Sequence, residues 1–149
     1  MKSNKELQNY FNTITTVDQF LEAEKNGFSV DFITYIPEMP GASFFHEACR
    51  CCHIDLIKFL FTNRQIDINM LDEDGCTPLG YVVNSDVYSE AWAGNAIATV
   101  NLGCENPKRI KETILYLTSI GCKASYCDVD YTPEYIFSYL ELISSSYKN

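Results

Sequence analysis

The sequence predicts an all-α protein: a solenoid of stacked helical repeats joined by short finger turns. The first observation is an internal echo, because GCTPLGYVV at residues 75–83 repeats the pattern of GASFFHEAC at residues 41–49, with the two glycines 34 residues apart. The second is HIDLIKFLF at residues 53–61, a strongly apolar run that follows the first copy. A short helix followed by a more apolar one cannot bury its apolar face alone, so such units must stack on their neighbours.

Size and composition indicate one folded domain. The chain has 149 residues, of which 46% are hydrophobic and 21% charged, which gives ample apolar area for a core. The formal net charge of -9 disfavours nucleic acid and anionic membranes as partners.

The sequence also indicates where the protein works. It has no apolar run of signal-peptide length near its start and no stretch of about 18 uncharged apolar residues, so we expect a cytoplasmic protein. Seven irregularly spaced cysteines, an odd number, predict free thiols in a reducing compartment.

Each element of the repeat has a local reason to form. Gly75 supplies a turn conformation with positive φ, the Thr77 hydroxyl can cap the helix that follows, and Pro78 occupies the first helical position, where its missing N–H costs nothing. After the helix at residues 53–61, QIDINMLDEDG at residues 65–75 alternates in hydropathy and ends in an acidic turn. This stretch predicts an extended finger that joins two units.

These residues resemble the ankyrin repeat. The match comprises Gly75, Thr77, Pro78 and Leu79 of one unit, and His46, Ala48, His53, Leu56, Ile57, Leu60, Asp67, Ile68 and Asn69 of the unit before it. The resemblance implies pairs of antiparallel helices with finger turns, and a protein that binds other proteins rather than an enzyme.

About four units cover most of the chain. We place them at residues 3–36, 37–70 and 71–126, with a C-terminal cap at residues 127–149. The first unit contains Thr16 and Gln19 at the spacing of a capping box. The last restarts the signature at Thr132 and Pro133 and ends in a capping helix.

The sequence departs from the repeat pattern in several places. Phe44 replaces the proline, and Gly80 replaces the histidine. Thr77 and Thr132 are 55 residues apart, which indicates an insertion of about 22 residues at approximately 84–107. This insertion holds Trp92, and it is interpreted either as a side element that contacts a partner or as a longer helix and loop packed onto the array.

The resemblance implies binding through the finger tips and the exposed side of the first helices. Acidic residues, from Asp72 to Asp74 and at Asp128 and Asp130, favour a partner with a basic surface, although acidic turns can also simply keep fingers soluble. The predicted partner-binding residues are Arg50, Glu73, Asp74, Asn84, Trp92, Asp128, Asp130 and Tyr131.

Other chemistry is poorly supported by the sequence. The cluster at residues 49–53 contains three cysteines and a histidine, yet its spacing differs from that of a closed zinc site. No phosphate-binding loop or nucleophile motif occurs, so we expect no catalytic residues, no metal and no cofactor.

The sequence therefore predicts a non-enzymatic, monomeric module that binds a partner protein. Two narrower hypotheses remain open: a microbial effector delivered to a host cytosol, or an immunity or inhibitor protein that covers a basic site on a toxin or enzyme. A zinc or redox sensor built on residues 49–53 is a third.

Overall fold

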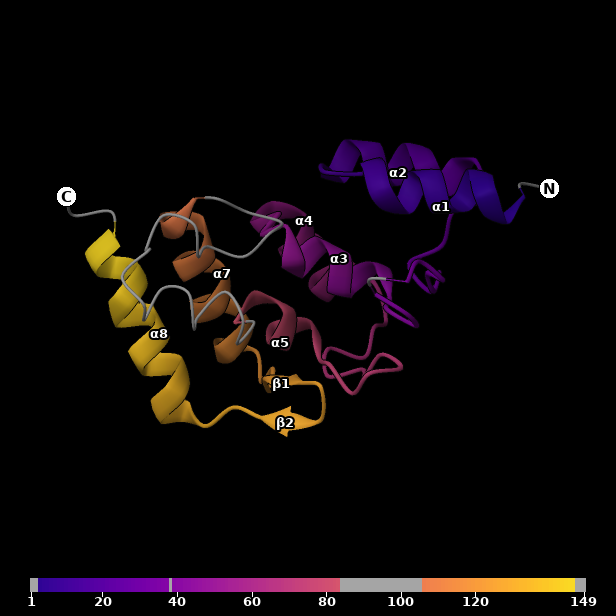
Figure 1. Ribbon diagram of the computed structural model, residues 1–149. Helices are drawn as coiled ribbons and strands as arrows, with labels where there is room; N and C mark the ends of the chain where they lie inside the picture. The colour runs from indigo at the N-terminus through magenta and orange to yellow at the C-terminus, as the bar shows by residue number, and fades with distance from the viewer. Residues whose placement is uncertain (1–2, 38, 84–105, 147–149) are drawn as a thin grey trace.

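The computed structural model describes residues 3–37, 39–83 and 106–146, and it is a stack of helices with fingers on one side (Figure 1). The helices are α1 (Asn4–Thr13), α2 (Val17–Lys25), α3 (Phe44–Arg50), α4 (Ile54–Asn63), α5 (Pro78–Val82), α7 (Pro107–Ser119) and α8 (Pro133–Ser146). Helix α3 packs on α1 and α5 in one row, and α4 packs on α2 and α7 in the other. The predicted helical repeat fold is confirmed; the unit boundaries stay predictions.

Side chains that precede the helices start them. Ser3, Thr16 and Ser43 each form a capping box with the residue three positions later, including the predicted pair of Thr16 and Gln19. The Thr77 hydroxyl accepts a hydrogen bond from the Gly80 N–H at 3.1 Å, as predicted. These local signals explain why helix starts could be predicted well.

An aromatic cluster fills the core between the first two helix pairs. The Phe44 ring stacks on Phe20 with centroids 5.7 Å apart and meets the edge of Phe28 at 5.2 Å. Phe44 is fully buried, so at this position a core aromatic takes the place of the repeat's proline. The departure therefore adds buried apolar surface, which offsets the loss of a residue preorganised for the helix.

The fingers that follow α2, α4 and α7 are called the first, second and third, and the third contains a small sheet that the all-α prediction omitted. Strands β1 (Ser125–Tyr126) and β2 (Val129–Asp130) pair antiparallel, with Ser125 opposite Asp130. Cys127 and Asp128 form the loop between them and both have positive φ, at 51° and 63°. Two such residues match the twist of a tight hairpin, so this finger turns without glycine.

The predicted insertion at 84–107 lies almost wholly outside the described residues, which resume at Asn106. Asn106 accepts hydrogen bonds from two backbone N–H groups at the start of α7, and Pro107 is the first helical residue. Among the helices that the structure describes, none combines the length and the apolar character needed to cross a membrane.

Candidate functional site

The fingers are joined to one another through their backbones. The N–H of Glu73 in the second finger donates to the carbonyl oxygen of Pro40 in the first, at 2.9 Å. The N–H of Asp128 in the third finger donates to the carbonyl oxygen of Gly75 in the second, at 3.2 Å. These equivalent bonds place the tips in a row beside one another (Figure 1).

His46 fixes the spacing between the second unit and the finger that follows. Its Nδ1 accepts the Ser43 N–H at 3.0 Å, so its Nε2 carries the proton and donates to the Cys76 carbonyl oxygen at 2.9 Å. The imidazole is fully buried, and this burial lowers the pKa of His46 below its usual value. A neutral His46 therefore forms hydrogen bonds both within its own unit, to Ser43, and to the next unit, at Cys76.

Gly80 has a different role in the next unit. Thr77 and Ser125 exchange two hydrogen bonds: the Thr77 N–H donates to the Ser125 carbonyl oxygen, and the Ser125 N–H donates to the Thr77 hydroxyl, both at 2.9 Å. A Cβ atom added to Gly80 would lie 2.7 Å from the Ser125 carbonyl carbon and closer still to its oxygen. Glycine replaces the histidine because β1 approaches α5 directly.

Asp72 belongs to the interior of the second finger, which corrects the prediction that it contributes to an acidic surface. Its Oδ1 accepts the N–H groups of Asp74 and Cys76, both at 2.9 Å, and its Oδ2 accepts the hydroxyl of Tyr81. Burial, reinforced by this carboxylate, raises the pKa of the Tyr81 hydroxyl. Asp72 is therefore a buried acceptor that shapes the finger.

Of the five predicted acidic residues, four remain exposed on the second and third fingers, and we call them the acidic rim: Glu73, Asp74, Asp128 and Asp130. Asp130 also accepts the Ser125 hydroxyl at 2.5 Å across the hairpin. The backbone bonds between fingers hold the residues of the rim on successive tips, so a partner would meet a preformed row of negative charge.

The other predicted residues differ in how accessible they are. Arg50 lies half-buried on α3 and pairs with Glu47 at 2.7 Å, so its charge is largely used within the helix. Tyr131 is also half-buried, and its ring stacks on Tyr135 with centroids 4.4 Å apart. Asn84 and Trp92 lie outside the described residues.

The cysteine and histidine cluster at 49–53 lies only partly in the core, because Cys51 and His53 are half-buried. Cys49 and Cys52 are buried, and Arg109 donates to the Cys52 carbonyl oxygen at 2.8 Å. Within residues 3–37, 39–83 and 106–146, no group of three or more His, Cys, Asp or Glu side chains could hold a metal ion. Of the described cysteines, Cys49, Cys52, Cys76 and Cys122 are buried, Cys51 is half-buried and Cys127 is exposed.

The fold and fingers define a helical repeat protein with a row of linked finger tips. Comparison with family models gives a match to ankyrin repeats (many copies) over residues 45–86, which spans α3, α4, the second finger and α5. This part of the chain is therefore similar to ankyrin repeats, which generally mediate protein–protein interaction. No curated protein matches the chain significantly.

Sequence reasoning missed one surface. Helix α8 carries apolar residues around most of its circumference, at Tyr135, Ile136, Phe137, Tyr139 and Leu140. A helix with this pattern is normally buried on all sides, yet the side chain of Phe137 is 61% exposed. The apolar pattern of α8 in the sequence is the signal that could have revealed this exposed apolar surface.

Proposed function

We propose that this protein is a non-enzymatic interaction module that binds a partner protein with a basic surface through the acidic rim. The main support is the row of four exposed carboxylates on fingers that are hydrogen-bonded to one another. A preformed charged row lowers the entropic cost of binding and speeds the encounter with an oppositely charged surface.

Binding through the acidic rim should depend on the salt concentration. Exposed charges are screened over about 10 Å at 0.1 M ionic strength, so binding through the rim should weaken as salt rises. Arg50 and Tyr131, which are half-buried beside other side chains, would contribute contact area at the edge of the site rather than the main charge.

Affinity capture from a cell lysate, with the purified chain as bait, tests this function. The rim variant carries Glu73→Lys, Asp74→Lys and Asp130→Lys. The control variant carries Asp18→Lys, Glu22→Lys and Asp55→Lys, three exposed residues on the second helices, and changes the net charge by the same amount. The proposal expects one protein to be captured by wild type and by the control, at low salt more than at moderate salt, and lost by the rim variant.

Equal loss in both variants would show that the net charge matters and the rim does not. Retention by the rim variant would place binding elsewhere on the chain. The identity of a captured protein also separates the narrower hypotheses: a host protein favours an effector, and a toxin or enzyme with a basic site favours an immunity or inhibitor protein.

A further inference from the structure

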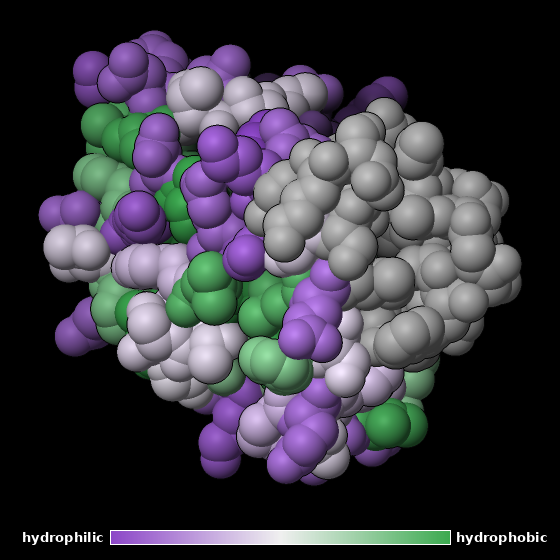
Figure 2. Space-filling model, turned by 90° about the vertical axis from the view of Figure 1, so that its left-hand side faces the viewer, coloured by the Kyte–Doolittle hydropathy of each residue, from purple (hydrophilic) through white to green (hydrophobic). Residues whose placement is uncertain are grey.

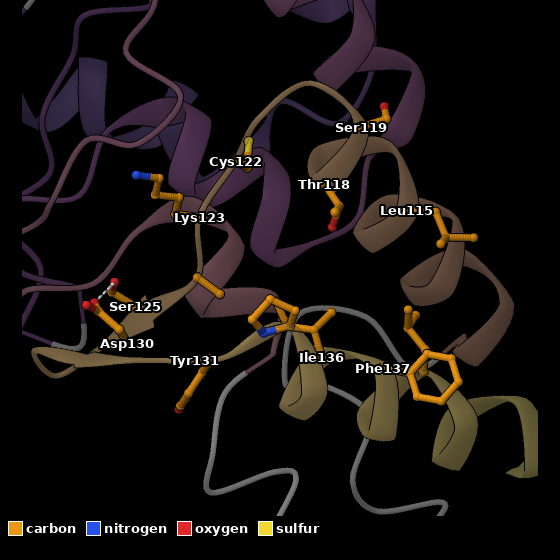
Figure 3. Close-up of a pocket in the computed structure, with 13 residues that line it drawn as sticks. Leu115, Thr118, Ser119, Cys122, Lys123, Ser125, Asp130, Tyr131, Ile136 and Phe137 are labelled. Carbon is orange, nitrogen blue, oxygen red and sulfur yellow. Dashed lines mark hydrogen bonds between the residues drawn. The ribbon is translucent and has the colours of Figure 1, made fainter.

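An apolar groove of about 640 Å³ lies between α7, α8 and the β1–β2 hairpin, and the acidic-rim residue Asp130 forms part of its edge (Figure 3). Leu115 and Thr118 line it from α7, and Ile136, Phe137 and Leu140 line it from α8. Figure 2 looks onto the end of the molecule that α8 forms, and it shows hydrophobic side chains gathered among hydrophilic ones. Leu115 is 51% exposed and Phe137 61% exposed, so the groove is open.

The packing of the repeats indicates which structural element would fit in the groove. In the row of second helices, α4 lies between α2 and α7. The ammonium of Lys58 on α4 lies 5.4 Å from the centroid of the Tyr116 ring, so Tyr116 marks the flank of α7 that faces α4. Leu115, about 100° away around the helix, lies on the groove side. The groove is therefore the next position in this row, next to α7 and against α8.

Equivalent positions in this chain hold second helices with apolar residues three and four positions apart. On α7 these are Ile110, Ile114 and Leu117, all fully buried. Among the described residues, no helix follows α7 in this row. Repetition of the same packing thus assigns the groove to an amphipathic helix of about three turns, whose apolar stripe would cover Leu115 and Phe137.

The charges around the groove indicate the flanks of that helix. Within one helical turn of the lining residues on α7 and α8, or on the segment 122–131 that carries the hairpin, the described carboxylates are Glu112, Asp128, Asp130, Glu134 and Glu141, and the described ammonium groups are Lys111 and Lys123. Lys111 already donates to the Ser144 hydroxyl at 2.9 Å. The surplus of carboxylates favours basic flanks on the helix and disfavours a second copy of this acidic chain.

We infer that the groove between α7 and α8 is a second docking site, which takes an amphipathic helix with basic flanks from a partner protein. Such a helix would complete the solenoid as one more second helix. This site adjoins the acidic rim at Asp130, which lines the groove, but its test does not depend on the rim's partner.

A synthetic peptide with the sequence of residues 106–120, NPKRIKETILYLTSI, is a suitable probe because it carries both the apolar stripe and three basic residues. Labelled with fluorescein, it is titrated with the full-length protein, and its anisotropy is followed. A second peptide with Lys108→Glu, Arg109→Glu and Lys111→Glu tests the charge requirement on unmodified protein. We expect the basic peptide to bind at least about ten-fold more tightly than the acidic one.

Protein variants locate the site. Leu115→Glu should weaken binding of the basic peptide by about ten-fold or more, since it places a charge in the apolar groove. Leu71→Glu is the matched control, because Leu71 is 56% exposed on the second finger and lies outside the groove. A variant with only Glu73→Lys and Asp74→Lys, which leaves Asp130 in the groove unchanged, should bind the peptide as wild type does, so failure of one site is distinguishable from failure of the other.

Three results would overturn the inference. The first is absence of peptide binding, and the second is equal binding to Leu115→Glu and wild type. The third is self-association of the wild-type chain in sedimentation equilibrium that Phe137→Glu abolishes, because the occupant would then be a second copy. Circular dichroism of each variant confirms that the helices are retained.

Discussion

Gly80 gives the sharpest test of how the third finger is held. In an ordinary helix, replacing glycine with alanine stabilises by about 1 kcal/mol, because alanine has the higher helix propensity. Here the added Cβ would meet the Ser125 carbonyl, so β1 would have to move away from α5. This movement breaks both hydrogen bonds between Thr77 and Ser125.

The magnitude follows from those two bonds. A buried donor or acceptor left without a partner costs about 1–3 kcal/mol, so losing the pair outweighs the gain in helix propensity. We expect Gly80→Ala to lower the free energy of unfolding by about 3 kcal/mol, and Tm by roughly 6–12 °C for a chain of this size. Urea titration followed by circular dichroism, together with thermal melting, measures both quantities.

Gly121→Ala is the matched control. A Cβ at Gly121 would meet nothing within 4 Å, but its φ of +97° is unfavourable for alanine, so we expect a loss of about 1 kcal/mol. The close approach of Ser125 predicts that Gly80→Ala is the more damaging change. If Gly80→Ala is neutral or stabilising while Gly121→Ala destabilises, the steric argument is wrong.

Three further predictions concern His46 and the cysteines. His46→Ala should destabilise by about 3 kcal/mol in urea titration, because it leaves the Ser43 N–H and the Cys76 carbonyl without partners; a loss below about 1 kcal/mol would contradict this role. Burial lowers the pKa of His46 from 6.5, so the unfolded chain takes up the proton first as pH falls below 6.5. The free energy of unfolding should then fall by at most about 1.4 kcal/mol per pH unit from this group, a slope that His46→Gln should reduce. Among the described cysteines, exposed Cys127 should react first with a thiol reagent in the native protein. Cys49, whose pKa is raised by burial, should react only on unfolding, as mass spectrometry can determine.

The helix starts could be predicted because their causes are local. Thr16, Thr77 and Pro78 act on the backbone within three residues, so the sequence itself holds the cap and the group it caps. The finger after α4 was expected for the same reason, since hydropathy and turn residues adjoin one another.

The departures from the repeat pattern at Phe44 and Gly80 could not be explained from the sequence, because the residues that cause them are distant in the chain. Phe44 depends on the rings of Phe20 and Phe28 in another unit, and Gly80 depends on the approach of Ser125 from the third finger. Asp72 was misplaced on the surface for a related reason. Nothing local distinguishes an exposed turn aspartate from one that accepts the Tyr81 hydroxyl inside the finger.

Part of the candidate site was accessible from sequence. The exposed rim residues Glu73, Asp74, Asp128 and Asp130 were all named, because acidic turn residues rarely fold inward without a partner. The α7–α8 groove was missed, since its identity as an open position in a row of helices depends on how α4 and α7 pack.

Hydrogen exchange of the protein with a captured partner bound tests the central claim most directly. If the acidic rim is the binding surface, backbone amides at residues 72–76 and 125–131 should exchange more slowly in the complex than in the free chain. The control with Asp18→Lys, Glu22→Lys and Asp55→Lys should show the same protection. A complex in which these finger amides exchange as in the free chain, with protection found only elsewhere, would contradict the proposed function.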